Sequence, residues 1–221
     1  MDLFLVTYLG EPKGSSGEEY GTPYDLSAAC AICGTGARVE HALKVKGVKN
    51  IKRNVFQTLD GDWLISENFY QLFSKNNVLV HGLKQVVHYK SRHQLPYYHL
   101  DADQCLPKCK ETKGLVVEGQ CQTCKRNGFF NDVIIGDLDK GIPTKIQPIE
   151  LGYKNLNHSF LNESDFLCTW EHLGLSCRKP DGNSVVRYAR PFLVVSDLAR
   201  TLMEEGGIED LKFEPLVILG G

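Results

Sequence analysis

The residues in this sequence with the most evident chemistry are four cysteines arranged in two tight pairs. The first pair is Cys30-Ala-Ile-Cys33, and the second, far along the chain, is Cys121-Gln-Thr-Cys124. A C-x2-C turn presents two thiolates side by side, and two such turns supply the four ligands of a tetrahedral structural zinc ion. The spacing therefore predicts a structural Zn²⁺ site formed by Cys30, Cys33, Cys121 and Cys124, which would clamp an early loop to a mid-chain loop.

Neighbouring cysteines and histidines leave two other ligand sets open. Cys105 and Cys109 lie close to the second pair, and together with it they would form a local site that costs less loop-closure entropy. A third possibility recruits His93 or His99 into a second metal centre. We favour the first set because it uses both C-x2-C pairs.

Motifs for catalysis are not found in the sequence. It contains no G-x-S-x-G elbow, no H-E-x-x-H helix and no phosphate-binding glycine loop. A C-x2-C pair can act as a redox dithiol, but a catalytic pair normally opens a helix after a buried strand, and neither pair is placed that way. An all-cysteine zinc site also has no open coordination position. We therefore expect a structural zinc, a protein that is not an enzyme, and ordinary buried or semi-buried thiols at Cys168 and Cys177.

Composition and charge indicate a globular protein of 221 residues. The chain is 42% hydrophobic and 24% charged, and its net charge of −2 gives no reason to expect a polyanionic partner. No segment reaches the ~18 apolar residues of a membrane span. Asp2 precedes the apolar opening, where a signal peptide would carry positive charge. Reduced cysteines without an export signal favour the cytosol, so we expect a cytoplasmic protein without membrane contact.

Two stretches share a strand–serine–helix–strand pattern. Ser66 and Ser196 each follow an apolar run and precede residues with helical periodicity, so each is expected to cap a helix. The helices should end at Asn76-Asn77 and at Gly206-Gly207. The flanking strands are expected at 63–65, 78–87, 192–195 and 212–219. The two units suggest a weak internal duplication, although capped strand–helix units in general look alike.

The remaining chain suggests short strands and loops. We expect a first strand at 3–9, a polar loop at 10–27, an edge strand or hairpin at 45–59, short strands within 133–149, a short helix at 165–174 and a turn at 180–183. The predicted fold class is α+β, a mostly antiparallel or mixed sheet with few helices, two strand–helix–strand units and a zinc-knuckle insertion. Residues 1–221 would form a single zinc-braced domain, with possible sub-parts 1–90 and 129–221 joined by the cysteine-rich segment 91–128.

The two motifs and the chain's ending resemble a known family. The early C-x2-C-G falls on Cys30, Cys33 and Gly34, the later C-x2-C falls on Cys121 and Cys124, and a strand–serine–helix–strand segment closes the chain. This layout is similar to the double-CxxCG family of bacterial immunity proteins, best known from myxobacteria. The second motif has a lysine where the family has its glycine.

The resemblance implies a zinc-binding immunity protein that neutralises a cognate toxin by direct protein–protein binding. Steric blocking of a toxin requires no catalytic residue. The polar loop 10–27, with Glu11, Glu18 and Glu19, and the segment 97–103 are the expected contact surfaces.

The alternative function is nucleic-acid binding by a zinc-ribbon-type module. Aromatic residues for base stacking and basic residues for phosphate contacts both occur near the second pair. They are Tyr97, Tyr98, Phe129 and Phe130, and Lys108, Lys110, Lys113, Lys125 and Arg126. The mildly acidic chain as a whole disfavours this alternative.

Overall fold

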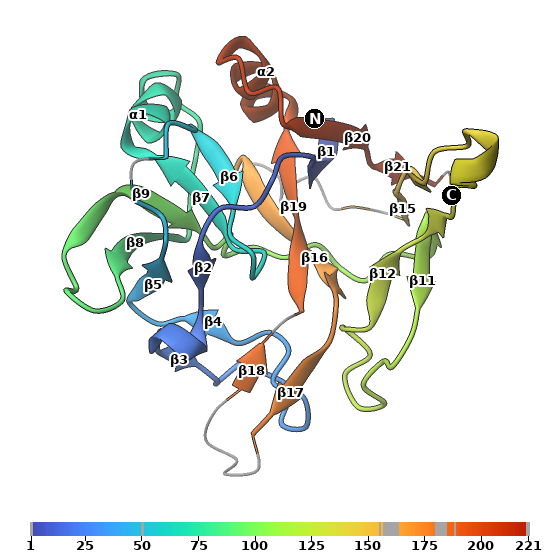
Figure 1. Cartoon of the computed structure of the whole chain (residues 1–221), viewed down its shortest axis with the longest axis horizontal. Coiled ribbons are helices and arrows are strands. Elements are labelled where there is room, and N and C mark those ends of the chain that lie inside the picture. The colour runs from blue at the N-terminus through green and yellow to red at the C-terminus, as the bar shows by residue number, and fades with distance from the viewer. Residues whose placement is uncertain are drawn as a thin grey trace.

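The computed structural model of the chain describes residues 2–49, 51–154, 156, 164–179, 185–187 and 189–219. The turn expected at 180–183 lies outside these residues, and β17 (Ser176–Arg178) and β18 (Val185–Arg187) flank it. Two six-stranded sheets dominate the described part, and two α-helices lie side by side across one end of both (Figure 1). The α+β class with mixed sheets and few helices is therefore confirmed.

The N-terminal half of the chain forms the first sheet, with strand order β2-β5-β8-β9-β7-β6. Its strands are β2 (Ser15–Ser16), β5 (Ala42–Lys46), β6 (Val55–Gln57), β7 (Trp63–Ser66), β8 (Leu83–His88) and β9 (Gln94–Leu100). The pair β5/β8 is parallel and the other neighbours are antiparallel.

The second sheet combines the N-terminal strand with strands from the C-terminal half, in the order β11-β12-β16-β19-β1-β20. Its strands are β1 (Leu3–Tyr8), β11 (Leu115–Val117), β12 (Phe129–Asn131), β16 (Phe166–Leu173), β19 (Arg190–Ser196) and β20 (Leu211–Pro215). Because β1 pairs with both β19 and β20, the chain's first strand lies inside the sheet made by its last ones.

Both strand–serine–helix–strand units are present. Helix α1 (Glu67–Lys75) follows β7 and helix α2 (Asp197–Glu205) follows β19. The Ser66 hydroxyl accepts the backbone N–H of Phe69, and the Ser196 hydroxyl accepts that of Ala199, which satisfies a donor left open in the first turn of each helix.

The two units also share a topology. In each, the strands before and after the helix run parallel to one another and a third, antiparallel strand lies between them, β9 in the first sheet and β1 in the second. The two halves of the molecule thus repeat one split strand–helix–strand arrangement, which agrees with the internal duplication suggested by the sequence.

The main core lies between the helices and the two sheets. Phe69 and Phe73 of α1 meet Phe166 of β16 and Met203 of α2 in one buried cluster. The helical spacing of these apolar residues places them on one face of each helix, and burying that face stabilises both helices. A second cluster, centred on Leu151, Tyr153 and Leu167, lies under the opposite face of the second sheet.

Two expectations for secondary structure are wrong. Residues 165–174, predicted as a short helix, form β16, a strand between β12 and β19. Phe166 faces the main core and Leu167 the second cluster, so this strand is buried on both faces, and its polar residues Thr169, Glu171 and His172 are buried as well. The strand expected at 78–87 begins later than predicted, because only β8, from Leu83 onward, pairs with neighbouring strands.

The remaining elements are short. They are η1 (Glu18–Tyr20), β3 (Tyr24–Asp25), β4 (Arg38–Val39), β10 (Glu111–Lys113), β13 (Val133–Ile134), η2 (Leu138–Lys140), β14 (Lys145–Ile146), β15 (Glu150–Tyr153) and β21 (Val217–Ile218). Of the helices in the described part of the chain, none is long and apolar enough to cross a membrane.

Candidate metal centre

The structure brings the four predicted cysteines together. The ligand atoms of Cys30, Cys33, Cys121 and Cys124 all lie within 4.8 Å of one another. A tetrahedron with Zn–S bonds of about 2.3 Å has S–S edges of about 3.8 Å. Two of the four distances between the pairs are 3.9 Å, from Cys30 Sγ to Cys121 Sγ, and 3.6 Å, from Cys33 Sγ to Cys124 Sγ. The cluster therefore has the size of a four-thiolate zinc site.

The two turns that present these sulfurs have the same backbone geometry. The N–H of Gly34 donates to the carbonyl of Cys30 at 2.8 Å, and the N–H of Lys125 donates to the carbonyl of Cys121 at 2.9 Å. Both donors adopt left-handed conformations, with φ of 78° at Gly34 and 54° at Lys125. The lysine that replaces the second motif glycine thus forms the same turn as the glycine does.

Hydrogen bonds from outside the C-x2-C motifs position both turns. The Cys30 N–H donates to the carbonyl of Thr35 at 2.9 Å, and the Thr35 hydroxyl lies 3.1 Å from Cys33 Sγ. In the second turn, the Cys121 N–H donates to Oδ1 of buried Asn127 at 2.9 Å. Neither residue was predicted from the sequence, although a small polar residue shortly after each pair is a local signal for such support.

The electrostatics of the cluster favour a bound cation. Burial opposes ionisation of Cys121, but the backbone N–H groups of Cys124 and Thr123 lower its pKa to about 7. Burial and then the neighbouring sulfur of Cys33 raise the pKa of Cys124 to about 12. Four sulfurs this close cannot all carry a negative charge without a counter-ion, and a divalent soft metal supplies one. The donor set fits Zn²⁺, held in a closed all-sulfur site.

The rival ligand sets are not assembled. Cys105 forms a disulfide with Cys168, so Cys105 is not a metal ligand and Cys168 is not the ordinary thiol expected from the sequence. Cys109 is buried, and its N–H donates to Glu171 Oε1 at 2.9 Å. The alternative site from Cys105, Cys109 and the second pair is therefore wrong for this structure. Cys177 is a free thiol, as expected, but it is exposed rather than buried or semi-buried.

The two histidines considered as ligands lie elsewhere. Nε2 of His99 is 3.6 Å from a carboxylate oxygen of Asp62, and the His93 ring stacks on His88. The cysteine cluster in the described residues contains neither of them. A second metal centre built on His93 or His99 is not supported by this arrangement.

The residues proposed for nucleic-acid contacts are only partly exposed. Tyr97 and Phe129 are buried in the core, and the Tyr98 ring packs against Tyr70. Lys113 pairs with Glu150. These aromatic rings therefore do not form one exposed stacking surface.

The segments expected to contact a partner are also more structured than a solvated loop. In the polar loop 10–27, Glu18 forms an ion pair with Lys179 at 3.0 Å. In the segment 97–103, Tyr97, Leu100 and Ala102 are buried, so their side chains offer little contact surface.

The sequence matches no protein-family model and no curated protein at a significant level. The described residues form a four-cysteine cluster with the dimensions of a zinc site, and this cluster joins the loop after β3 to the loop before β12.

Proposed function

We propose that this protein is a zinc-braced immunity protein that binds a cognate bacterial toxin and blocks it sterically. The proposal rests on the resemblance of its two cysteine motifs to the double-CxxCG family and on a surface feature suited to protein binding. The zinc would act as a structural brace, because a closed four-thiolate site leaves no coordination position for a substrate.

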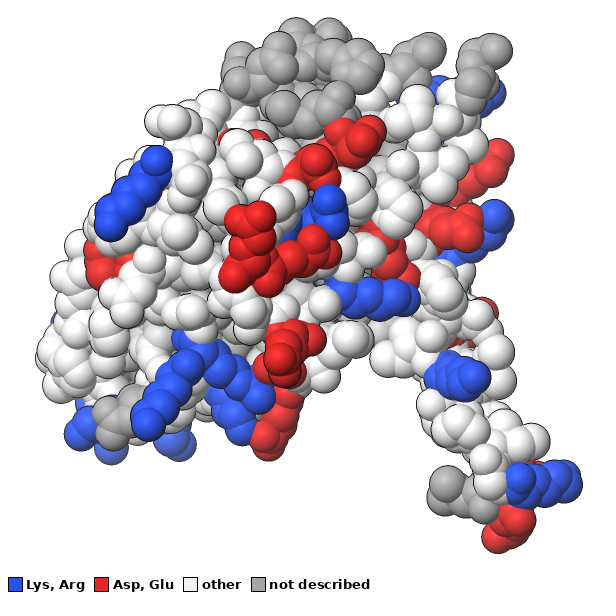
Figure 2. Space-filling model, turned by 90° about the horizontal axis from the view of Figure 1, so that it is seen from above, with Lys and Arg blue, Asp and Glu red and all other residues white. Residues whose placement is uncertain are grey.

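The surface feature is a hairpin arm, defined as residues 132–147. Figure 2 shows a narrow arm that projects from the body of the molecule, and the short pair β13/β14 forms its shaft. Large apolar side chains on the arm are exposed to solvent. They are Val133, Ile134, Ile135, Ile142 and Ile146, with exposed fractions between 41% and 85%. The exposed apolar surface of the arm is the single observation that supports the proposed mode of action.

In water, a two-stranded hairpin gains little stability from apolar side chains that stay exposed to solvent. Isolated hairpins are marginally stable in water, and the arm is held at its base by backbone bonds from Asp132 to Gly114 and from Gln147 to Asp132. Fully burying a Val or Ile side chain contributes about 1.5–3 kcal/mol, so seating even two of them in a partner's cleft would supply the core of an interface. A projecting apolar arm is suited to insertion into a concave surface, such as the active-site cleft of a toxin.

The test is co-expression with the toxin encoded beside this gene. The chain should rescue growth, and the purified proteins should form a complex by isothermal titration calorimetry. Ile135→Asp, at the most exposed arm position, should weaken the complex at least about tenfold, because it would place a charge in an apolar interface.

The matched control is Leu59→Asp, since Leu59 is 70% exposed on the body, outside the arm. This variant should bind like the wild type. Equal binding by both variants would refute the role of the arm, and failure of the wild-type chain to rescue growth or form a complex would refute the proposed function.

A further inference from the structure

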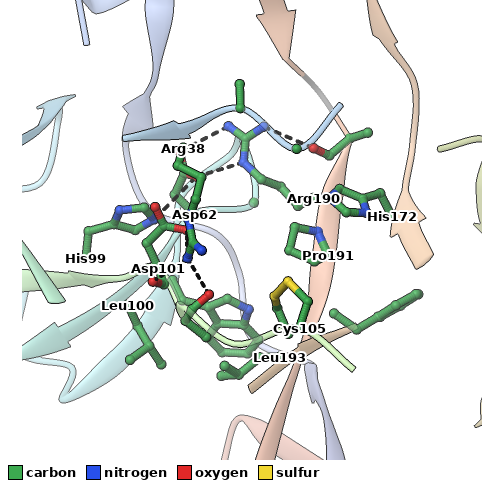
Figure 3. Close-up of a pocket in the computed structure, with 18 of the residues that line it drawn as sticks. Arg38, Asp62, His99, Leu100, Asp101, Cys105, His172, Arg190, Pro191 and Leu193 are labelled. Carbon is green, nitrogen blue, oxygen red and sulfur yellow. Dashed lines mark hydrogen bonds and ion pairs between the residues drawn. A yellow bond between two sulfur atoms is a disulfide. The ribbon is translucent and has the colours of Figure 1, made fainter. Parts of the chain in front are cut away.

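Besides the metal cluster and the arm, the molecule contains a pocket of about 190 Å³ between its two sheets. The first sheet contributes Asp62, Trp63 and the end of β9, and the second contributes Arg190 to Leu193 of β19. Figure 3 shows side chains from both sheets converging on this space. The volume is comparable to the cavity of about 150 Å³ that admits benzene in an engineered protein. A ligand with a ring-sized body fits these dimensions.

Charged groups in the pocket are mostly matched. Arg190 binds Asp62 through two bonds, Nε to Oδ1 at 2.7 Å and Nη2 to Oδ2 at 3.1 Å. Arg38 donates to the backbone carbonyls of Asp101 and Asp103 at 3.0 and 2.9 Å, and also contacts the Asp101 carboxylate at 3.4 Å. These two arginines therefore have their donors committed to the protein.

Arg126 is the exception among the pocket's arginines. Within the described residues no carboxylate lies within ion-pair distance of it, and its Nε is buried without a hydrogen-bond partner. Arg38 lies within 3.4 Å of the carboxylates of Asp101 and Asp103, and Arg190 binds that of Asp62, so Arg126 is the pocket arginine left without a carboxylate in the described residues. A buried N–H donor without a partner is costly, and a bound anion removes that cost.

A glycine of the first cysteine loop leaves room for the guanidinium of Arg126. A Cβ added to Gly36 would lie 2.9 Å from both Nη atoms of Arg126. Gly36 follows the first cysteine pair and Arg126 follows the second, so the loops of the metal cluster hold this wall of the pocket. The apolar part of the lining includes Trp63, Leu100 and Leu193.

We infer that this pocket binds a small monocarboxylate with an apolar body, whose carboxylate pairs with Arg126 and whose body packs on the wall of Trp63, Leu100 and Leu193. The nearby carboxylates of Asp62 and Asp101 would repel a second negative charge, which favours a monoanion over a dianionic phosphate ester. The planar guanidinium of Arg126 suits the two oxygens of a carboxylate. This site is separate from the arm and does not depend on the proposed function.

The experiment titrates the full-length, zinc-loaded protein with sodium benzoate, following ligand NMR line broadening and calorimetry. Benzoate should bind saturably, while neutral benzamide and dianionic phenyl phosphate should bind at least about tenfold more weakly. Absence of saturable benzoate binding, or equal binding of benzamide, would overturn the inference. Tighter binding of phenyl phosphate would overturn the assignment of the ligand as a monocarboxylate.

Two variants locate the site. Arg126→Met should weaken benzoate binding at least about tenfold, whereas Lys125→Met, which removes the neighbouring exposed charge, should leave it unchanged. Ala28→Trp places a bulky ring at the exposed rim of the pocket without disturbing the core, and it should also abolish binding. Because Ala28 is exposed, this second variant keeps the test decisive even where Arg126→Met fails to fold. Undiminished binding by Ala28→Trp would place benzoate elsewhere and refute the site.

Discussion

Gly34 and Lys125 occupy equivalent positions in the two cysteine turns. Each donates its backbone N–H to the carbonyl of the first cysteine of its pair, and each has a positive φ, 78° and 54° respectively. The left-handed conformation costs a residue with a Cβ about 1–2 kcal/mol, whereas glycine adopts it freely. The second turn therefore keeps the geometry of the first at an energetic cost.

The first prediction follows from this strain. Lys125→Gly should raise the free energy of unfolding by about 1 kcal/mol, because relief of the left-handed strain exceeds the entropy that glycine loses on folding. Guanidinium unfolding of the zinc-loaded protein measures the change. Lys110→Gly is the matched control, since Lys110 is exposed and its φ is not positive, so this change should destabilise. A destabilised Lys125→Gly protein would contradict the strain argument.

A second prediction concerns the metal. The wild-type protein should contain about one zinc per chain by mass spectrometric metal analysis, and Cys124→Ser should lose it, because a hydroxyl is a poor substitute for one of four thiolates. Zinc loss should also expose the loops around both pairs to amide hydrogen exchange, since the metal-bound sulfurs join them.

The control for the metal prediction is Cys177→Ser, which changes a free, exposed thiol outside the cluster. It should retain zinc and wild-type stability. Full zinc content in Cys124→Ser would show that the cluster is not the binding site.

A third prediction concerns the disulfide between Cys105 and Cys168. The two residues are 63 positions apart, so the bond constrains a long loop in the unfolded chain. Reduction with a phosphine should lower the free energy of unfolding by about 2–4 kcal/mol. Zinc content should not change, because neither cysteine belongs to the cluster.

The double variant Cys105→Ala/Cys168→Ala should be insensitive to the same reductant. If the wild-type protein unfolds at the same denaturant concentration with and without reductant, the bond contributes nothing to stability and the prediction fails.

Local features of the fold could be predicted from the sequence, and long-range ones could not. The caps at Ser66 and Ser196 depend on a few neighbouring residues. The helix starts at Glu67 and Asp197 could therefore be predicted from the local sequence pattern. The sequence favours grouping the four cysteines, because this set uses both C-x2-C pairs, but it leaves the local set with Cys105 and Cys109 open. By contrast, the disulfide partner of Cys105 depends on where β16 lies in the sheet.

The misassigned segment 165–174 shows why periodicity failed there. A strand buried on both faces has no solvent-exposed polar face, so Thr169 and Glu171 do not mark one, and a short segment ending in glycine is equally compatible with a helix. At Arg190 the sequence gives a weak indication of a buried ion pair. This residue opens the apolar strand β19, where an arginine requires a buried partner, but no sequence pattern identifies Asp62 as that partner.

The buried pair of Asp62 and Arg190 leads to the last prediction. Asp62 precedes β7 in the first sheet and Arg190 begins β19 in the second, so their two hydrogen bonds join the sheets. Burial opposes the charge of Arg190, but Asp62 more than offsets this and raises the pKa of the guanidinium. Because an arginine is not deprotonated in proteins, Arg190 stays charged when its partner is removed, and Asp62→Ala should cost about 3–5 kcal/mol of stability.

The control for this pair is Lys113→Ala, which removes an exposed ion pair with Glu150 and should cost less than about 1 kcal/mol. The double variant Asp62→Leu/Arg190→Met should recover much of the loss, because it removes the uncompensated charge together with the pair. Urea unfolding of the three variants measures these differences. If Asp62→Ala cost no more than Lys113→Ala, the pair would not join the two sheets energetically, and cooperative unfolding of the sheets would have to depend on the apolar core that they share.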